Sequence, residues 1–415
     1  MNIGEKIKEL RKERKMTLAQ VAGERISKGM LSLIENGKAQ PSMESLQHIA
    51  KQLQIDVSEL MQTKDNAEIR KLYLKIEPLV GQLKKEFDEL IFDQKCQQII
   101  DLIKPYIEEG ELNGTVFEEI RLTEIYDLMH YYLKRNLSID PFVEIVERYK
   151  QIHAYSQIVK GYSRIASVEF MVRHYEEAIE WLLKGESYIS HYEAFVGEIE
   201  QLDLYYNLMA VYAALNNDEK SEHYLQLALE IAHEKKILYR VHDFYRYLFF
   251  INVMKEDGEK ALEYLKKIEA FSIIFEDPIE VVIVELAQLI YLNNVVKDYN
   301  KVIQTTVNYL HLPTDVIKQM NQFIFGEFAY AHFQLKQFNE AMGYLKNIEG
   351  PKLHHHPLDA IRFYRSFAVR ALCYLENGEI EDAKRDILYA MDGVKDFKDS
   401  IDKRLIINAY ETIMH

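Results

Sequence analysis

The feature that most constrains the fold is a spacing. Small or short side chains recur about every 40 residues from residue 178 onward, each followed one helical turn later by a larger residue. The small positions are Ala178, Ser221, Ala261, Val302, Ala341 and Ala383, and the later positions are Leu182, Leu225, Leu265, Thr306, Leu345 and Ile387. Helix pairs at a fixed period bury their apolar faces only against neighbouring pairs. The spacing therefore predicts an all-α solenoid, because 415 residues are too many for one compact core.

Two of these units carry the clearest repeat motif. Aromatic, small and large residues align in both, as Tyr175, Ala178 and Leu182 and again as Phe338, Ala341 and Leu345. The motif resembles the tetratricopeptide repeat, which implies a right-handed solenoid with a concave inner face. These units exceed the usual period of about 34 residues, and Val302 and Thr306 fit poorly, so we expect extended helices. We also expect weaker units around Cys96 and Phe142, and a closing helix from Arg404 to His415.

Residues 16–38 have a different pattern, that of two short helices joined by a turn. Thr17 and Gln20 have the spacing of a capping box for the first helix. Ser27 is placed to cap the second helix, and Asn36-Gly37 ends it with a residue that tolerates positive φ. The small and polar residues that open the second helix are then expected to face outward.

The first 61 residues closely resemble the Cro/C1-type helix-turn-helix domain, on these caps, on residues 34–38 and on Pro41-Ser42. The resemblance implies five short helices and double-stranded DNA as a partner, with the second of the two short helices in the major groove. Leu18 stands where the family often has Gln, so a contact made there is lost or shifts to Gln20. The alternative is an ordinary helical hairpin. The residues that the resemblance assigns to DNA are Arg11, Thr17, Gln20, Ser27, Lys28, Gly29, Ser32, Asn36 and Lys38.

Charge divides the chain at the same boundary. The net charge is −15, yet residues 1–61 hold ten basic against eight acidic side chains. A basic segment suits phosphate contacts, whereas the acidic remainder repels DNA and is expected to act on something else. We therefore expect a DNA-binding domain at 1–61, a linker or connecting helix at 62–75, and a repeat domain at 76–415.

The motifs of catalysis and cofactor binding are absent from the sequence. It has no Gly-rich phosphate loop, nucleophile elbow or Cys-x-x-Cys pair. The adjacent His354, His355 and His356 lie in a Pro-flanked loop and are not expected to converge on one metal ion. Cys96 and Cys373 are expected to be buried and reduced. No apolar run approaches the roughly 18 residues of a membrane span, so we expect a cytoplasmic protein that binds no membrane. Because the catalytic and cofactor motifs are missing, we expect that it is not an enzyme and takes no cofactor or metal.

A Cro-type domain followed by a long, degenerate tetratricopeptide array resembles the quorum-sensing regulators of Gram-positive bacteria, the Rap/Rgg/NprR/PlcR/PrgX group. Length and the number of units make the chain most like NprR. The resemblance implies that the array binds a short, re-imported signalling peptide in its concave face. Binding would change a homodimer or higher homo-oligomer, and so the engagement of a two-fold symmetric DNA site. Two alternatives stay open: a Rap-like protein that sequesters a response regulator or stimulates its dephosphorylation, and a scaffold with a vestigial DNA domain.

Helical geometry suggests where such a peptide would lie. Aligning the small residues with the motif starts the first helices near Leu202, His242, Ile283 and Gln322, each with one stripe facing the groove. Inward amides can pair with an extended backbone, arginine with a carboxylate, and tyrosines can offer flat apolar walls. Alternatively, several tyrosines pack between helices. Asn207 leads the set because its position resembles the peptide-clamping Asn of related arrays. The full set is Tyr206, Asn207, Arg246, Tyr247, Gln288, Tyr291, Asn294, Glu327 and Tyr330.

Overall fold

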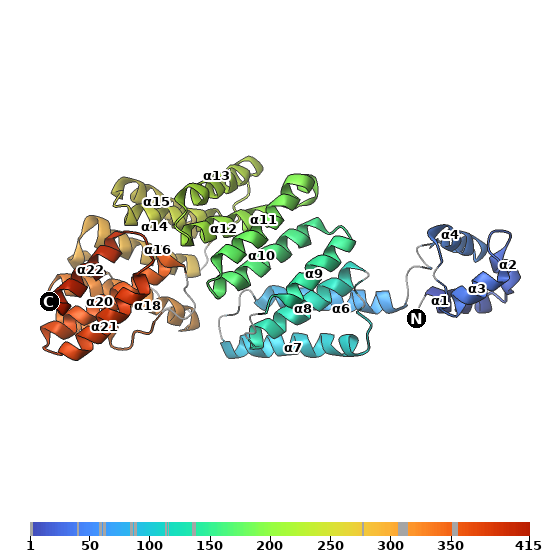
Figure 1. Cartoon of the computed structure of the whole chain (residues 1–415), viewed down its shortest axis with the longest axis horizontal. Helices are drawn as coiled ribbons and strands as arrows, with labels where there is room; N and C mark the ends of the chain where they lie inside the picture. The colour runs from blue at the N-terminus through green and yellow to red at the C-terminus, as the bar shows by residue number, and fades with distance from the viewer. Residues whose placement is uncertain are drawn as a thin grey trace. The chain divides into compact units, whose positions relative to one another are not determined.

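The protein is all-helical in the part of the chain that the computed structural model describes (Figure 1). The described residues are 3–39, 41–57, 60, 64–83, 86, 89–112, 114, 116–134, 138–275, 278–305, 314–350 and 356–415. They divide into two compact units, Met1–Asn136 (unit 1) and Leu137–His415 (unit 2). The prediction of an all-α fold is confirmed.

Unit 1 begins with the short helices of the predicted DNA-binding domain. Its helices are α1 (Ile3–Glu13), α2 (Leu18–Ala22), α3 (Lys28–Glu35), α4 (Met43–Gln52), α6 (Lys64–Leu83), α7 (Glu89–Glu108) and α8 (Phe117–Lys134). Ile7, Val21, Leu31 and Ile49 meet in the core of the first four, each fully buried. Helix α6 occupies most of the predicted connecting segment, and α6, α7 and α8 pack on one another.

Unit 2 is built from consecutive antiparallel helix pairs. Its elements are α9 (Asp140–Gln151), α10 (Tyr155–Met171), α11 (Tyr175–Tyr192), η1 (Glu193–Phe195), α12 (Glu198–Ala214), α13 (Asp218–Lys235), α14 (Val241–Met254), α15 (Gly258–Phe275), α16 (Pro278–Tyr291), η2 (Leu292–Val296), α17 (Tyr299–Gln304), α18 (Thr314–Gln334), α19 (Phe338–Leu345), α20 (Pro357–Glu376), α21 (Ile380–Val394) and α22 (Ile401–Met414). Helix α14 begins one residue before its predicted start, and α12, α16 and α18 begin four to eight residues before theirs. Helix α22 packs on α20 and α21 as the expected closing helix.

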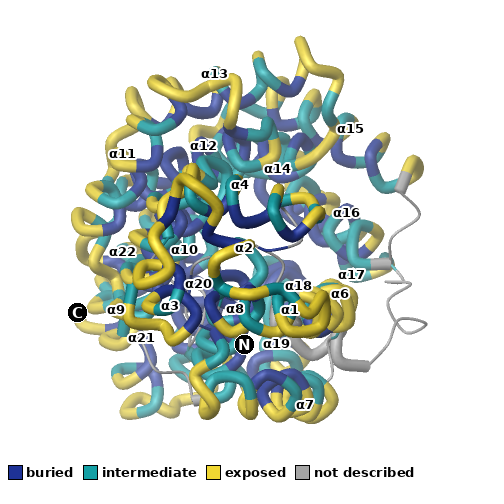
Figure 2. Tube along the Cα trace, turned by 90° about the vertical axis from the view of Figure 1, so that its right-hand side faces the viewer, coloured by how far each residue is buried: buried dark blue, intermediate teal, exposed yellow. Residues whose placement is uncertain are grey.

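The small residues that define the period lie at the helix contacts within each pair. All six are at most 1% exposed, on α11, α13, α15, α17, α19 and α21. Ser221 fits this tight position because its hydroxyl lies 3.0 Å from the Met209 carbonyl, to which it donates, and 2.7 Å from the Tyr247 hydroxyl. The larger partner residues are buried too, except that Thr306 lies outside the described residues. Figure 2 shows the same division on α11, α13 and α15, whose buried and exposed turns alternate.

The unit indexed by Val302 departs from the pattern, as its poor fit indicated. Its first helix ends in the π-helical turn η2, and its second, α17, is short. Residues Ile279–Val296 have a mean hydropathy of 1.6, and by length and composition alone this helix could span a membrane. The expectation that no apolar run reaches the length of a membrane span was therefore wrong. Within unit 2, however, Val282, Leu289 and Ile290 of this stretch are fully buried in a core shared with α14, α15 and α18. The stretch is therefore accounted for as a core helix.

The array of unit 2 curves so far that helix pairs distant in the sequence touch. The Asn216 amide, in the turn between α12 and α13, donates to the Asp396 carbonyl at 3.3 Å, and Lys398 pairs with Asp218. Arg404 of α22 likewise pairs with Glu256, at the turn between α14 and α15. These contacts join segments well over a hundred residues apart and enclose the inner face of the helices α12, α14, α16, α18 and α20.

Candidate functional site

Side-chain caps define the two short helices of the N-terminal domain. The Thr17 hydroxyl accepts the Gln20 N–H at 3.3 Å, and the Gln20 Oε1 accepts the Thr17 N–H at 2.7 Å. The predicted capping box is confirmed. The Ser27 hydroxyl accepts the Met30 N–H at 3.1 Å, so α3 begins at Lys28. Orphan donors at both helix starts are thereby satisfied.

Gly23 allows α2 to lie against α4. Its φ is +56°, and an added Cβ would lie 2.8 Å from Nε2 of His48. That nitrogen is itself 2.8 Å from the Ala22 carbonyl, where it ties α4 to the end of α2. Only glycine combines this φ with this contact. The end of α2 is therefore fixed against α4.

One face of α3 is left open to solvent. Lys28 and Gly29 are exposed, and Ser32 is partly exposed one turn later. Met30 and Leu33 are large apolar residues with 46% and 44% exposure. The sequence expectation of small and polar residues on this face did not include Met30. Lys38, beyond the helix end, is also exposed.

Two of the residues assigned to DNA have structural partners instead. Arg11 donates from Nε and Nη2 to the two oxygens of Glu35, at 2.6 and 2.8 Å, and from Nη1 to the Met16 carbonyl. The hydrogen bonding to Glu35 raises the pKa of Arg11. Arg11 therefore joins α1 to α3, and its phosphate contact stays a prediction. The Asn36 amide caps α3 by donating to the Ser32 carbonyl at 2.7 Å and accepts from Lys8.

Unit 2 contains a cavity of about 270 Å³ on its inner face. Helices α12, α14, α16, α18 and α20 all contribute to it, with one residue from α15. Its walls are mainly apolar, including Phe249, Phe250, Ile283 and Phe323. Charged side chains enter it from α14 and α20, as Asp243, Arg246, Asp359 and Arg362. A cavity with apolar walls and a few convergent polar groups is the usual form of a binding site.

The cavity brings together three of the nine residues predicted to bind a peptide, Tyr206, Arg246 and Tyr247. Asn207 is partly exposed on α12, beside the lining residue Tyr206. Gln288 is exposed and donates to Glu269 of α15 at 2.8 Å, so it points away from the inner face. Tyr291 packs on the core of α14 to α18. Neither of these two residues lines the cavity, and each contacts a neighbouring helix.

Arg246 does not stand alone as the sequence suggested. It pairs with Asp243, one turn earlier on α14, whose side chain is 7% exposed. Asp243 also accepts from Arg240 at 3.0 Å, and Arg240 donates to Asp203 at 2.8 Å. The carboxylate that Arg246 was expected to recognise is thus supplied in part by the protein itself.

His356, the last of the three adjacent histidines, lines the cavity. The other two lie outside the described residues. Its Nδ1 accepts the Leu358 N–H at 3.2 Å, so its Nε2, 3.2 Å from the Ala210 carbonyl, carries the proton and donates. Burial lowers its pKa, which keeps the ring neutral. The ring also stacks on Phe170 of α10, with centroids 6.3 Å apart. His356 therefore joins the start of α20 to α10 and α12 across the inner face.

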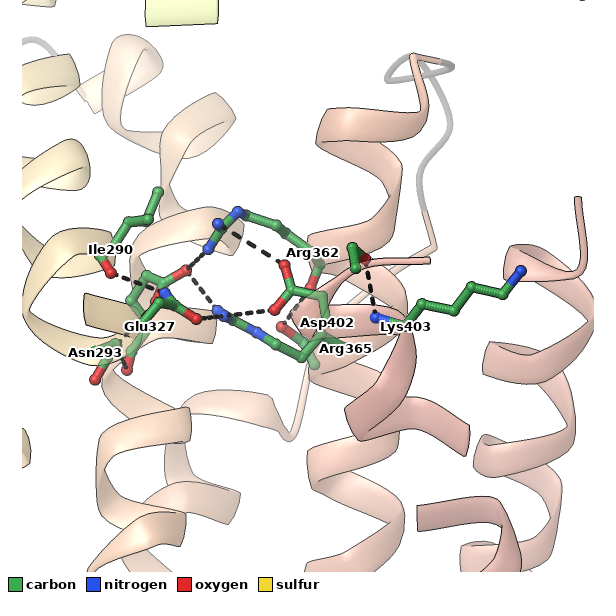
Figure 3. Close-up of polar contacts among 10 residues, drawn as sticks. Ile290, Asn293, Glu327, Arg362, Arg365, Asp402 and Lys403 are labelled. Carbon is green, nitrogen blue, oxygen red and sulfur yellow. Dashed lines mark hydrogen bonds and ion pairs between the residues drawn. The ribbon is translucent and has the colours of Figure 1, made fainter. Parts of the chain in front are cut away.

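A buried polar cluster lies behind the cavity (Figure 3). Oε1 of Glu327 accepts from Nη1 of Arg362 at 2.8 Å and from Nη2 of Arg365 at 2.5 Å. Arg365 also donates to Oδ1 of Asp402 at 3.1 Å, and Asn293 donates to Oε2 of Glu327 at 2.8 Å. Glu327, Arg365 and Asp402 are each 1% exposed.

Three predicted groove residues belong to this cluster or its surroundings, which corrects their assignment. Glu327 is its central acceptor. Asn294 is 7% exposed and donates to the Ile290 carbonyl at 2.8 Å. Tyr330 lies under the Arg365 guanidinium, 4.8 Å from its ring centroid, and burial raises its pKa to about 12. They lie in the interior because α20 and α22 cover the stripe that they occupy.

The cavity residues that the sequence did not predict lie on α20. Asp359 and Arg362 line the cavity, yet no repeat position pointed to them, because α20 was not among the helices indexed. His356 was weighed only as a metal ligand. In the described residues no cluster of His, Cys, Asp or Glu is arranged to hold a metal ion.

Comparison with known proteins identifies the N-terminal domain. Residues 7–60 match the helix-turn-helix family model. No curated protein matches the chain. Among solved structures, Bacillus thuringiensis PlcR in complex with the peptide PapR7 and DNA is 18% identical over 64% of this chain and 88% of its own, with a TM-score of 0.35. ComR from S. thermophilus, in complex with DNA and its signalling peptide ComS, is 16% identical over 71% and 99%, with a TM-score of 0.32. A signal transduction ATPase with a tetratricopeptide repeat sensor, from Pyrococcus horikoshii, is 17% identical over 99% and 68%, with a TM-score of 0.40. Residues 7–60 thus form a helix-turn-helix domain of the matched family, in a chain that continues as an array of helical hairpins.

Proposed function

We propose that this protein is a peptide-responsive transcription regulator. Two copies of the domain at 1–61 bind a two-fold symmetric DNA site, a connecting segment follows at 62–75, and the repeats of 76–415 bind a short peptide and associate the subunits. The observation that carries the proposal is the combination of an exposed, capped α3 with a mainly apolar cavity on the inner face of a helical array. PlcR and ComR, with peptide and DNA in their solved complexes, suggest the same pairing of ligands.

For DNA, the proposal rests on the open face of α3. Lys28, Gly29 and Ser32 form a small polar surface that leaves room for base edges. An added Cβ on Gly29 would find its nearest neighbour 3.9 Å away, so this surface is not crowded by the protein. Met30 and Leu33 offer apolar contact to thymine methyl groups. Since the cap uses Oε1 of Gln20, its NH₂ group is the part that would donate to DNA.

For the peptide, the size and chemistry of the cavity are the argument. Its 270 Å³ falls at the lower edge of the range for small-molecule sites, about 300 to 1,000 Å³. It therefore suits a few side chains of an extended peptide whose remaining residues lie outside it. The aromatic and aliphatic walls accept apolar side chains, and Tyr206, Tyr247 and the charged groups accept polar ones.

Replacing Lys28 by Ala is expected to weaken specific DNA binding by about 1 to 3 kcal/mol if it reads a base edge. The matched control is Lys51→Ala, which removes another exposed charge, from α4. The site is first selected from random duplex DNA with the full chain, and binding is then measured by footprinting at fixed salt. A footprint that survives the combined loss of Lys28, Ser32 and Gln20 unchanged would move the DNA surface to another helix.

Narrowing the cavity is expected to reduce peptide binding by about tenfold. Ala210→Leu places a larger side chain into the wall, while Ala270→Leu makes the same change at an exposed position of α15. Cytoplasmic peptides that co-purify with each full-length variant are identified and quantified by mass spectrometry. Equal recovery from both variants would show that the peptide binds elsewhere, and no recovery from the wild-type chain would refute peptide binding.

A further inference from the structure

One acidic side chain in the cavity wall has no partner among the described residues. Asp359, in the first turn of α20, lines the cavity and is only partly buried. Its carboxylate forms no hydrogen bond or ion pair with any residue that the structure describes, and both oxygens stay accessible to solvent. The positive end of the α20 helix dipole favours the ionised form of this carboxylate. The cavity therefore offers a charged acceptor to a group that enters it.

Two neighbouring groups of the wall indicate that the Asp359 carboxylate lies on the cavity side of α20. Burial raises the pKa of Tyr206, and the charges of Asp243 and Asp359 raise it further. Burial lowers the pKa of His356, and the charge of Asp359 opposes that change. Tyr206 and His356 both line the cavity, from α12 and from the start of α20. Asp359 is therefore close enough to both to act on them electrostatically.

The other charged side chains of the cavity are neutralised within the protein. Arg246 and Asp243 belong to the chain of ion pairs that runs from α14 to α12, in which two arginines meet two acids. Arg362 belongs to the buried cluster of Figure 3, where again two arginines meet two acids. The ring of His356 is neutral. Among the described residues that line the cavity, Asp359 is thus the charge that the protein leaves unbalanced.

Tyr206 adds a second free acceptor to the same cavity. Its hydroxyl forms no hydrogen bond within the described part of the chain and stays accessible to solvent. A carboxylate accepts hydrogen bonds only, and a hydroxyl oxygen can accept them too. An ammonium group has three donors, no acceptor and a full positive charge, so it matches this pair of acceptors in both charge and hydrogen bonding. A carboxylate of the ligand would instead be repelled by Asp359.

We propose that Asp359 binds an ammonium group of the peptide, either the N-terminal amine or a lysine side chain. The site rests on the proposed peptide function and adds the charge that the cavity selects. It differs from the sequence expectation, in which Arg246 would pair with a carboxylate of the peptide. It also assigns α20, outside the indexed stripes, as the helix that selects the ligand by charge.

Three pools of random octapeptides, all without Arg and His, test the proposal on the immobilised full-length protein at about 0.15 M salt. The first pool has free N-termini but no Lys, the second has acetylated N-termini with Lys included, and the third is acetylated and lacks Lys. We expect the first or the second pool to be retained about tenfold more than the third, because only an ammonium group makes the charge-assisted hydrogen bond. Whichever pool is retained identifies the source of the ammonium group.

A variant separates Asp359 from the general negative charge of the chain, which also attracts cations. Asp359→Asn keeps the size of the side chain and removes its charge, so we expect it to retain the three pools equally. The matched control, Asp392→Asn, removes an acid that is 80% exposed on α21 and should keep the preference. A preference that survives Asp359→Asn at full strength would overturn the site.

Equal retention of all three pools by the wild-type protein would also overturn the ammonium site, while leaving peptide binding intact. Retention of none of them would refute the proposed function, and the site with it. If Asp359→Asn does not fold, as judged by circular dichroism, Asp359→Ser takes its place, because serine is well tolerated at the start of a helix and carries no charge.

Discussion

Glu327→Gln is expected to lower the free energy of unfolding of unit 2 by about 3 to 5 kcal/mol, because it leaves the buried Arg362 and Arg365 without their shared anion. Asp402 would then be the remaining carboxylate in the cluster. Since folded domains are stable by only about 5 to 15 kcal/mol, the loss would be a large part of the total. The measurement is urea unfolding of the full chain followed by circular dichroism.

The matched control is Glu263→Gln. Glu263 pairs with Lys267 on the surface of α15, where its side chain is 56% exposed. Exposed pairs of this kind contribute about 0.3 to 0.5 kcal/mol, so this variant should unfold close to the wild type. Similar midpoints for both variants would show that the cluster of Glu327, Arg365 and Asp402 is not a major source of stability.

This cluster also marks the limit of what could be predicted from the sequence. The period of small residues correctly located the second helices, because a small side chain is required wherever two helices of a pair come closest. It also placed Glu327 and Asn294 on the inner faces of their helices. It did not indicate what covers those faces, because the covering residues Arg365 and Asp402 belong to α20 and α22, the helices that follow in the array. Contacts between helices of successive repeats leave no pattern within either helix.

The N-terminal domain was more fully predicted, since its signals are local. Capping by Thr17 and Ser27 depends on neighbours three residues away, and the structure shows both bonds. The π-helical turn η2 had no such signal, although the poor fit of Val302 indicated an irregular unit. The pair of Arg11 with Glu35 could not be predicted, because a basic residue on the first helix has the same appearance in the sequence whether it meets phosphate or a buried carboxylate.

Arg11→Met is expected to abolish DNA binding by unfolding the helix-turn-helix domain. Glu35 is 3% exposed, and without Arg11 it is a buried carboxylate that has lost its two-pronged partner. Leaving such a charge costs about 3 kcal/mol, a large share of the stability of a domain of this size. Hydrogen exchange of the full chain should then show lost amide protection in α1 to α4, with unit 2 unchanged. Retention on duplex DNA at low salt should fall in parallel.

The double variant Arg11→Met with Glu35→Met separates this structural role from a phosphate contact. Removing both charges leaves no unpaired ion, and replacement of a buried pair by apolar side chains is often close to neutral. We therefore expect the double variant to recover amide protection and DNA retention, although it lacks Arg11. If the double variant were as well protected as the wild type yet still failed to bind DNA, Arg11 would have to reach the phosphates, as the sequence first suggested. On the proposed function, the ion pair of α1 and α3 would act on DNA binding through the fold of the domain, and Lys28 and its neighbours on α3 would determine the sequence that is read.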